Sequence, residues 1–197
     1  MRCLLVTKEN TFTHSLKRIK MGKRLKELNP ALQNFIEEQK IFFVGTARSQ
    51  GSVNVSPKGM DTFRIIDSKK IVWLNLTGSG NETAAHLLDN DRMTIMFCSF
   101  EKMPLILRLY GNAKIYHEND KEYIAYSSLF EDFVGARQII EMDINLVQTS
   151  CGYAVPFMDF NEERSQLKDS DIKKGRNGVK QYWKDNNTKS LDGFDTK

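Results

Sequence analysis

The chain has 197 residues, of which 40% are hydrophobic and 10% aromatic, and its formal net charge is +4. This apolar content is enough for one sizeable core, so we expect one main domain. No apolar run approaches the roughly 18 to 20 residues of a membrane-spanning helix, which argues against a transmembrane class. We therefore expect a soluble protein with no membrane partner.

Cysteine and histidine are scarce and widely spaced. Cys3, Cys98 and Cys151 are an odd number without a CxxC pair or a secretory signal, which favours a reducing compartment over a disulfide framework. The three histidines show neither an HExxH nor a His-x-His pattern. We expect no metal site and a cytoplasmic location.

Basic side chains gather near the start of the chain, where before residue 30 only Glu9 and Glu27 oppose them. Such an arm can bind nucleic acid or an anionic membrane, but more often it is a solvated terminus. We expect a flexible basic arm over residues 1–24 and no nucleic-acid partner. Met21 is a second plausible start, so the first 20 residues could be an extension that the fold does not need.

The first predicted elements are a helix and a hairpin. Residues 28–39 place apolar side chains at helical spacing, with Pro30 in the first turn. Residues 41–47 and 53–56 have the pattern of two strands joined by a tight turn and closed by Pro57.

Two further hairpins pair residues 63–66 with 71–75 and residues 93–100 with 105–117. These six strands, with one helix inserted at residues 79–89, favour a mainly β fold, an antiparallel sheet that curls into a barrel with flanking helices.

After residue 121 the pattern changes to a helix near residues 123–129 and a last strand at residues 139–147. The polar residues 161–197 should wrap over the domain or a dimer instead of building a core. We therefore place the main domain at residues 25–160.

The string NLTGSGNETAAHLLDN, residues 75–90, leads from an apolar strand through two glycines into the inserted helix. Ser79 and Glu82 stand three apart, as in a capping box, and Asn81 is a second candidate N-cap. Free N–H groups at such a helix start attract anions. The alternative is a well-capped surface helix that only joins two strands.

Three strings, in this order and spacing, resemble the pyridoxamine 5'-phosphate oxidase-like family of FMN-binding split barrels. They are FFVGTARSQGSVNVSPKGM, IVWLNLTGSGNETAAHLLDNDRMTIMF and LILRLYGNAKIY. The resemblance covers residues 35–117, and SCGYAVPFMDF and SLDGF are similar to strings of an uncharacterised branch. It implies a six-stranded antiparallel split β-barrel that forms a homodimer, with one FMN in each of two clefts at the interface.

The resemblance also implies where the cofactor lies. Residues 53–58 would follow the flavin ring system, residues 73–75 the ribityl chain, and residues 81–83 the phosphate. The cofactor-binding residues expected from this placement and from nearby chemistry are Asn54, Val55, Ser56, Lys58, Trp73, Leu74, Asn75, Asn81, Thr83, Arg108, Cys151 and Tyr153.

Three of these residues have two interpretations each. Arg108, on an apolar strand, either adds positive charge near the phosphate or faces outward into water. Lys58 either stabilises the reduced flavin or is a solvated loop lysine. Cys151 has no histidine near it in sequence, so we expect a small buried cysteine and not a nucleophile, with Tyr153 packed near the cleft. No catalytic residue is identified.

Two departures separate this chain from true pyridoxamine phosphate oxidases. Those enzymes have an Arg-Lys pair where Glu82 and Thr83 stand here. An acid beside a phosphate is unfavourable unless it faces away or accepts from backbone N–H groups. Their terminal Trp and Arg segment has no match in residues 190–194, so vitamin B6 oxidation is not predicted.

The expected function is an FMN-dependent oxidoreductase that passes hydride or electrons between NADH or NADPH and a small-molecule acceptor or oxygen. A flavin- or haem-binding module without turnover and a deazaflavin-dependent reductase remain open alternatives. A nucleic-acid-binding protein that acts through the basic arm is a third class, and it predicts binding that falls steeply with salt.

Overall fold

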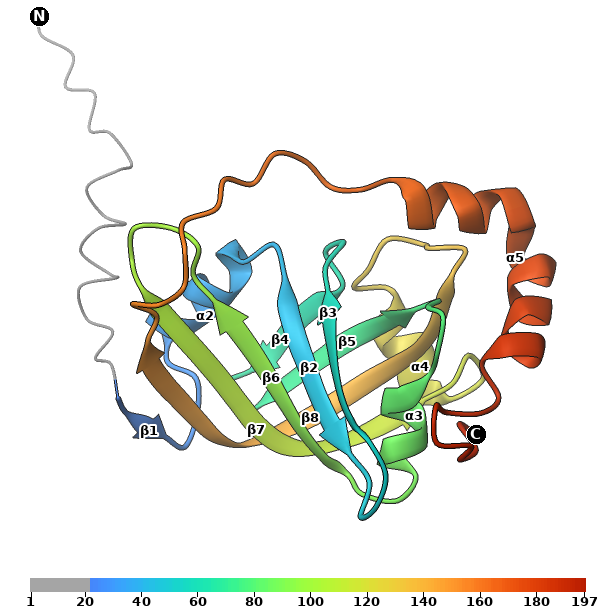
Figure 1. Cartoon of the computed structure of the whole chain (residues 1–197), viewed down its shortest axis with the longest axis horizontal. Helices are drawn as coiled ribbons and strands as arrows, with labels where there is room; N and C mark the ends of the chain where they lie inside the picture. The colour runs from blue at the N-terminus through green and yellow to red at the C-terminus, as the bar shows by residue number, and fades with distance from the viewer. Residues whose placement is uncertain (1–21) are drawn as a thin grey trace, which may run out of the picture.

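The computed structural model describes residues 22–197 and contains one antiparallel sheet (Figure 1). The strands run in the order β3-β2-β6-β7-β8-β5-β4, and β1 pairs with β8. Since β3 and β4 form two free edges, the sheet is open, and the predicted mainly β split-barrel fold is confirmed. The strands are β1 (Arg24–Leu25), β2 (Phe42–Ala47), β3 (Val53–Lys58), β4 (Phe63–Asp67), β5 (Lys70–Leu76), β6 (Arg92–Cys98), β7 (Leu105–Tyr116) and β8 (Ala136–Cys151).

Four helices flank the sheet within the described residues: α2 (Pro30–Glu38), α3 (Glu82–Leu87), α4 (Lys121–Ser127) and α5 (Gln166–Asn186). The first begins where the sequence predicts, because the Asn29 side chain accepts a hydrogen bond from the Leu32 N–H at 3.0 Å. In Figure 1, α2 lies behind the sheet and the C-terminus lies beside α3.

The main core lies between α2 and the inner face of the sheet. Apolar side chains of α2 pack with alternate residues of the strands, as period-two burial requires. Phe42 is central, with ring centroids 5.0 Å from Phe63, 6.1 Å from Trp73 and 5.9 Å from Phe97. Each large apolar side chain buried here contributes about 1.5–3 kcal/mol to stability.

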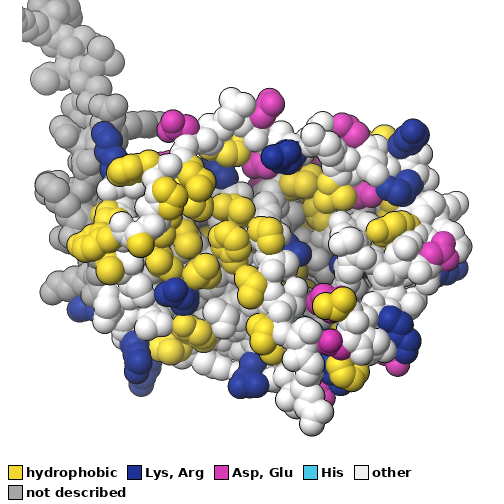
Figure 2. All heavy atoms as spheres, in the orientation of Figure 1, with side chains coloured by type: hydrophobic (Ala, Val, Ile, Leu, Met, Phe, Trp, Pro, Cys, Tyr) yellow, Lys and Arg dark blue, Asp and Glu magenta, His cyan; other side chains and the backbone are white. Residues whose placement is uncertain are grey.

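The other face of β2, β3, β6 and β7 is apolar, and no helix of the described chain lies in front of it in Figure 1. The pairing sets Phe43 beside Met96 and Met96 beside Arg108 on this outer face. Val53 and Val55 of the edge strand are 73% and 65% exposed. Figure 2 shows hydrophobic side chains gathered on this side of the molecule.

The sequence predicts a basic arm at one end of the chain and a polar tail at the other. Most of the predicted basic arm lies outside the described residues, but Arg24 pairs with Gln148 of β8. In the polar tail, α5 is a long helix that the sequence patterns do not predict, and it bends at Gly175, where φ is 65°. Residues 187–196 then fold back toward the glycine turn before α3.

Candidate functional site

A polar cavity of about 500 Å³ opens between the inner side of β3, the glycine turn at residues 78–80 and the C-terminal residues 189–191. Arg137 of β8 also lines it. The cavity brings together residues from three separate parts of the sequence prediction. These are Asn54, Ser56, Lys58, Asn75, Asn81 and Thr83.

The alternation of β3 explains why three of them share one side. Asn54, Ser56 and Lys58 pair with Thr46, Val44 and Phe42 of β2, whose side chains are buried on the inner face. Side chains of a strand alternate between faces, so the residues between these three point to the outer face. Pro57 is tolerated because β3 is an edge strand, where a missing N–H need not break the sheet.

Side-chain amides hold the wall of the cavity in place. The Asn54 Nδ2 donates to Thr83 Oγ1 at 3.3 Å and lies 3.4 Å from Thr46 Oγ1. The Asn75 Nδ2 donates to Gln138 Oε1 at 3.0 Å. These contacts tie β3 to α3 and β5 to β8, so the polar groups of the cavity are positioned before any ligand arrives.

Lys58 supplies positive charge at one side of the cavity. Its Nζ lies 5.1 Å from the centroid of the buried Trp73 ring, a cation–π contact. Burial, with a smaller contribution from the charge of Arg137, lowers the pKa of Lys58 to about 8. The solvated-loop interpretation of this lysine therefore does not describe its surroundings.

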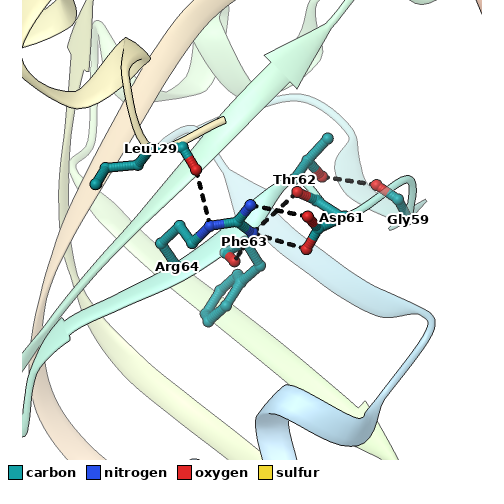
Figure 3. A network of polar contacts seen from close by, with 6 residues as sticks. All are labelled: Gly59, Asp61, Thr62, Phe63, Arg64 and Leu129. Carbon is teal, nitrogen blue, oxygen red and sulfur yellow. Dashed lines mark hydrogen bonds and ion pairs between the residues drawn. The ribbon is translucent and has the colours of Figure 1, made fainter. Parts of the chain in front are cut away.

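The turn that follows Lys58 is fixed by the contacts in Figure 3. The Arg64 guanidinium donates to both carboxylate oxygens of Asp61 at 2.8 Å and to the Leu129 carbonyl at 3.0 Å. Thr62 Oγ1 donates to the Gly59 carbonyl at 2.7 Å. Asp61 has a φ of 54°, a conformation that costs energy outside glycine, and these bonds compensate for it.

Arg137 is a cavity residue that the sequence did not indicate. It is 8% exposed, and its Nη1 donates to the Gly80 carbonyl at 3.2 Å and to Asn187 Oδ1 at 2.7 Å. Burial lowers the pKa of this guanidinium to about 10. It stands just before the predicted last strand and belongs to no recognisable motif. The one sign of its role in the sequence was a single arginine near the apolar pair Ile139 and Ile140.

The predicted capping box at α3 is not formed. Asn81 is the N-cap residue but makes no side-chain capping bond, and the helix has only six residues. The Glu82 carboxylate instead accepts from the Leu191 N–H, at 3.0 and 3.1 Å. The acid thus binds a backbone N–H, which is one of the two arrangements that make it tolerable near an anion.

Six other predicted residues do not line this cavity. Trp73 is buried in the main core, and Leu74 packs in a second cluster with Phe133. Val55 and Arg108 lie on the outer face, where Arg108 Nη1 donates to Ser150 Oγ at 3.2 Å.

Cys151 forms the last register pair of β8, with Leu105 of β7, and Tyr153 follows two residues later. The expectation that Cys151 is buried is wrong, because it is exposed. It ends the long β8 strand, where no core element of the described chain covers it. Tyr153 is 77% exposed.

Residues 22–197 contain neither a cluster of metal-binding side chains nor a helix that could span a membrane. No group of three or more histidine, cysteine, aspartate or glutamate side chains there could hold a metal ion. In the same part of the chain, no helix has both the length and the apolar character needed to cross a bilayer.

The sequence matches the model of the pyridoxamine 5'-phosphate oxidase family over residues 28–151. It is also 40% identical, over 137 residues, to the Aspergillus flavus pyridoxamine 5'-phosphate oxidase family protein ustO. That alignment covers 67% of this chain and 55% of the relative. The chain thus spans little more than half the length of this relative.

Two solved structures share the fold at low sequence identity, and a third is less similar. A Lactobacillus delbrueckii protein provisionally described as a pyridoxamine 5'-phosphate oxidase superposes with a TM-score of 0.53 at 14% identity, covering 65% of this chain and 98% of its own. A variant of HupZ from Group A Streptococcus gives a TM-score of 0.50 at 21% identity, with coverages of 61% and 98%. HutZ, described as the heme storage protein of Vibrio cholerae, gives 0.46 at 16% identity, with coverages of 64% and 96%.

Proposed function

Because the chain belongs to the pyridoxamine 5'-phosphate oxidase family, we propose that the polar cavity binds FMN and that the protein is an FMN-dependent oxidoreductase. The observation that carries this proposal is that six of the expected cofactor-binding residues, from two separate strings of the sequence, line one cavity. The electron donor would be NADH or NADPH, and the acceptor a small molecule or oxygen.

The side chains around the cavity fit a phosphorylated, hydroxyl-rich cofactor. Asn54, Asn75 and Asn81 offer amide groups, and Ser56 and Thr83 offer hydroxyls, which suit the ribityl and phosphate oxygens of FMN. Two nearby cations, Lys58 and Arg137, offset the charge of a phosphate. The volume lies within the usual range for cofactor sites, about 300–1,000 Å³.

The same lining does not favour haem. Among the described residues around the cavity there is no histidine, cysteine, methionine or tyrosine, the side chains that ligate haem iron. A haem module would therefore need its axial ligand from elsewhere. A deazaflavin shares the phosphate and ribityl groups of FMN, so only a binding comparison separates these two cofactors.

A homodimer formed through the outer face would account for four of the six predicted residues that do not line the cavity. Val55 and Arg108 lie on that apolar face, and Tyr153 is exposed beyond the end of β8. We propose that these residues and Cys151 reach the cofactor of the partner chain. An exposed apolar patch beside an unpaired edge strand is typical of a surface that is covered in the assembled protein.

Bound FMN would supply the hydride and electron transfer, while the chain supplies binding, orientation and charge. Lys58 would hold a positive charge near the cofactor, where it favours a negatively charged form. The amides of β3 and β5 would orient the cofactor, because their own hydrogen bonds already fix them.

Binding is tested by adding FMN to the purified protein and recording the visible absorption spectrum before and after desalting. We expect flavin bands that persist in the wild type and weaken at least about tenfold in the double variant Asn81→Ala/Thr83→Ala, which removes two polar side chains. Asn145→Ala, at an exposed site on β8, is the matched control and should behave as the wild type. A protein that retains no FMN would refute the proposal, and retention of a deazaflavin alone would correct the cofactor.

Turnover is tested on the FMN-loaded protein by mixing it with NADH or NADPH under anaerobic conditions and then adding oxygen or a dye. Bleaching of the flavin bands followed by their return supports an oxidoreductase. Bound FMN that neither nucleotide reduces would favour a flavin-binding module without turnover.

A further inference from the structure

Arg137 and Lys58 are two cations on the wall of the polar cavity, and neither takes part in any ion pair found among residues 22–197. A buried charge without a counter-charge is costly. No carboxylate of residues 22–197 forms an ion pair with either cation, which leaves room for an anion from outside.

The contacts of Arg137 are all with neutral acceptors. The carbonyl of Gly80 and the side-chain oxygen of Asn187 each accept from Nη1, and the buried Nε has no hydrogen-bond partner. The guanidinium is thus held in place while its full charge and one N–H remain uncompensated. Buried polar atoms without partners are rare in folded proteins, and one explanation is a missing ligand.

Glu82 is the acid that lines the same cavity, and its carboxylate is already engaged. Both oxygens accept from the Leu191 N–H, at 3.0 and 3.1 Å. Glu82 thus binds the backbone of the C-terminal segment, which comprises residues 187–196. Among residues 22–197, no ion pair joins Glu82 to Arg137.

We propose that Arg137 is the residue that binds the phosphate of the ligand in this cavity, and that Asn187 of the C-terminal segment positions it. This inference rests on the proposed function and names the group that recognises the phosphate monoester. Arg137 would supply from β8 the positive charge that residues 82 and 83 do not provide. A planar guanidinium suits a phosphate because it can donate two parallel hydrogen bonds.

Asn187 is suited to a positioning role by its own contacts. It is 3% exposed, and its Nδ2 donates to the carbonyls of Gly78 and Ser79 at 3.2 and 3.3 Å. Its side chain thus binds the glycine turn with one end and Arg137 with the other. Pairing these carbonyls reduces the repulsion that their negative ends would exert on an anion.

The rest of the C-terminal segment anchors Asn187. Thr196 Oγ1 donates to the Asn187 carbonyl at 2.5 Å. The Asp192 carboxylate accepts from the Ser52 N–H at 2.7 Å, and the Phe194 ring lies 4.1 Å from the Arg48 guanidinium carbon. Contacts to the β2–β3 turn and α3 therefore fix the segment over one side of the cavity, so its last residues are part of the site.

The test compares FMN with riboflavin, which lacks only the phosphate. We expect wild-type protein to bind FMN more tightly than riboflavin, and Arg137→Met to weaken FMN binding roughly 10- to 100-fold while riboflavin binding stays unchanged. Lys114→Met, an exposed lysine of β7, is the control and should alter neither affinity. An Arg137→Met protein that keeps the full preference for FMN would overturn the proposal.

Asn187→Asp tests whether Asn187 positions Arg137 or has only a structural role. It also provides a second test if the Arg137→Met protein does not fold. A carboxylate at this position gives Arg137 an internal partner, so FMN affinity should fall at least about tenfold while riboflavin affinity, which does not depend on the phosphate, falls less. Unchanged FMN affinity in this variant would overturn the role of Asn187.

Inorganic phosphate distinguishes failure of this inference from failure of the proposed function. If wild-type protein binds neither flavin, FMN binding is refuted, but the anion site is still testable by thermal unfolding with added phosphate. A melting temperature that rises with phosphate in the wild type and not in Arg137→Met supports Arg137 as an anion receptor. Equal responses in the two proteins would overturn it.

Discussion

The two sides of β3 have opposite character. Asn54, Ser56 and Lys58 face a polar cavity whose walls are tied together by side-chain hydrogen bonds. Val53 and Val55, between and beside them, are exposed on an apolar face. One edge strand thus contributes to a ligand site on one side and to an uncovered surface on the other.

The difference shows which part of the site a single chain forms by its own contacts. The cavity is organised by contacts within the chain, including bonds between residues more than 100 positions apart. The outer face has no such partners from a helix in the described residues, and an exposed apolar edge is a liability for an isolated monomer. Substitutions on the outer face should therefore affect the dimer, and substitutions on the cavity side should affect ligand binding.

The largest effect is expected from Val55→Glu on the outer face. A charge buried in a dimer interface, present twice by symmetry, should raise the dimer dissociation constant at least about 100-fold. Analytical ultracentrifugation measures this constant. Ser56→Ala, the neighbour on the cavity side, is the matched control and should leave the dimer intact. Equal dissociation of the two variants would contradict the assignment of the faces.

Lys58→Met tests the cavity side of the same strand. Loss of one cation that faces an anionic ligand should weaken FMN binding about tenfold, and the dimer should persist. Titration of FMN followed by flavin fluorescence gives the affinity, with Lys114→Met again as the control. If FMN binds equally well without Lys58, the lysine does not face the phosphate or the flavin ring.

The pH dependence of binding should follow Lys58, whose pKa is lowered to about 8. FMN affinity should fall several-fold between about pH 7 and 9, because the lysine loses its charge over this range. Stability should move the other way: between about pH 8 and 10.5 the unfolded chain keeps the proton that the folded protein releases, so the free energy of unfolding rises with pH. Lys58→Met should abolish both dependences, measured by FMN titration and by urea unfolding.

The smallest effect is expected from Arg64→Met, in the turn of Figure 3. Its hydrogen bonds to Asp61 and Leu129 lie near the surface, so their loss should lower the free energy of unfolding by about 1 kcal/mol. FMN affinity should change by less than about twofold, since the turn does not line the polar cavity. A loss as large as that of Lys58→Met would show that this turn controls the position of Lys58.

Much of the fold could be predicted because its signals are local. An apolar run identifies β2, alternation identifies β3, and Asn29 with Pro30 marks the start of α2. The polar composition of residues 161–197 concealed α5, since a helix with few apolar residues gives little periodic signal.

The parts of the site that could not be predicted depend on distant partners. Glu82 left the expected capping box because it binds the Leu191 N–H, 109 residues away in sequence. Arg137 acquires its surroundings from Gly80 and Asn187, which no local pattern connects. The resemblance placed β3, β5 and the glycine turn together and extended to residues 190–194, but it did not say that the C-terminal segment contacts Glu82 and Arg137.

The most direct test of the central claim is size-exclusion chromatography of the protein after incubation with FMN, with light scattering and absorbance at 280 and 450 nm recorded together. The account predicts a dimer that carries flavin at a ratio of one FMN per chain. A colourless peak, at the mass of either a monomer or a dimer, would contradict the assignment of the polar cavity as an FMN site.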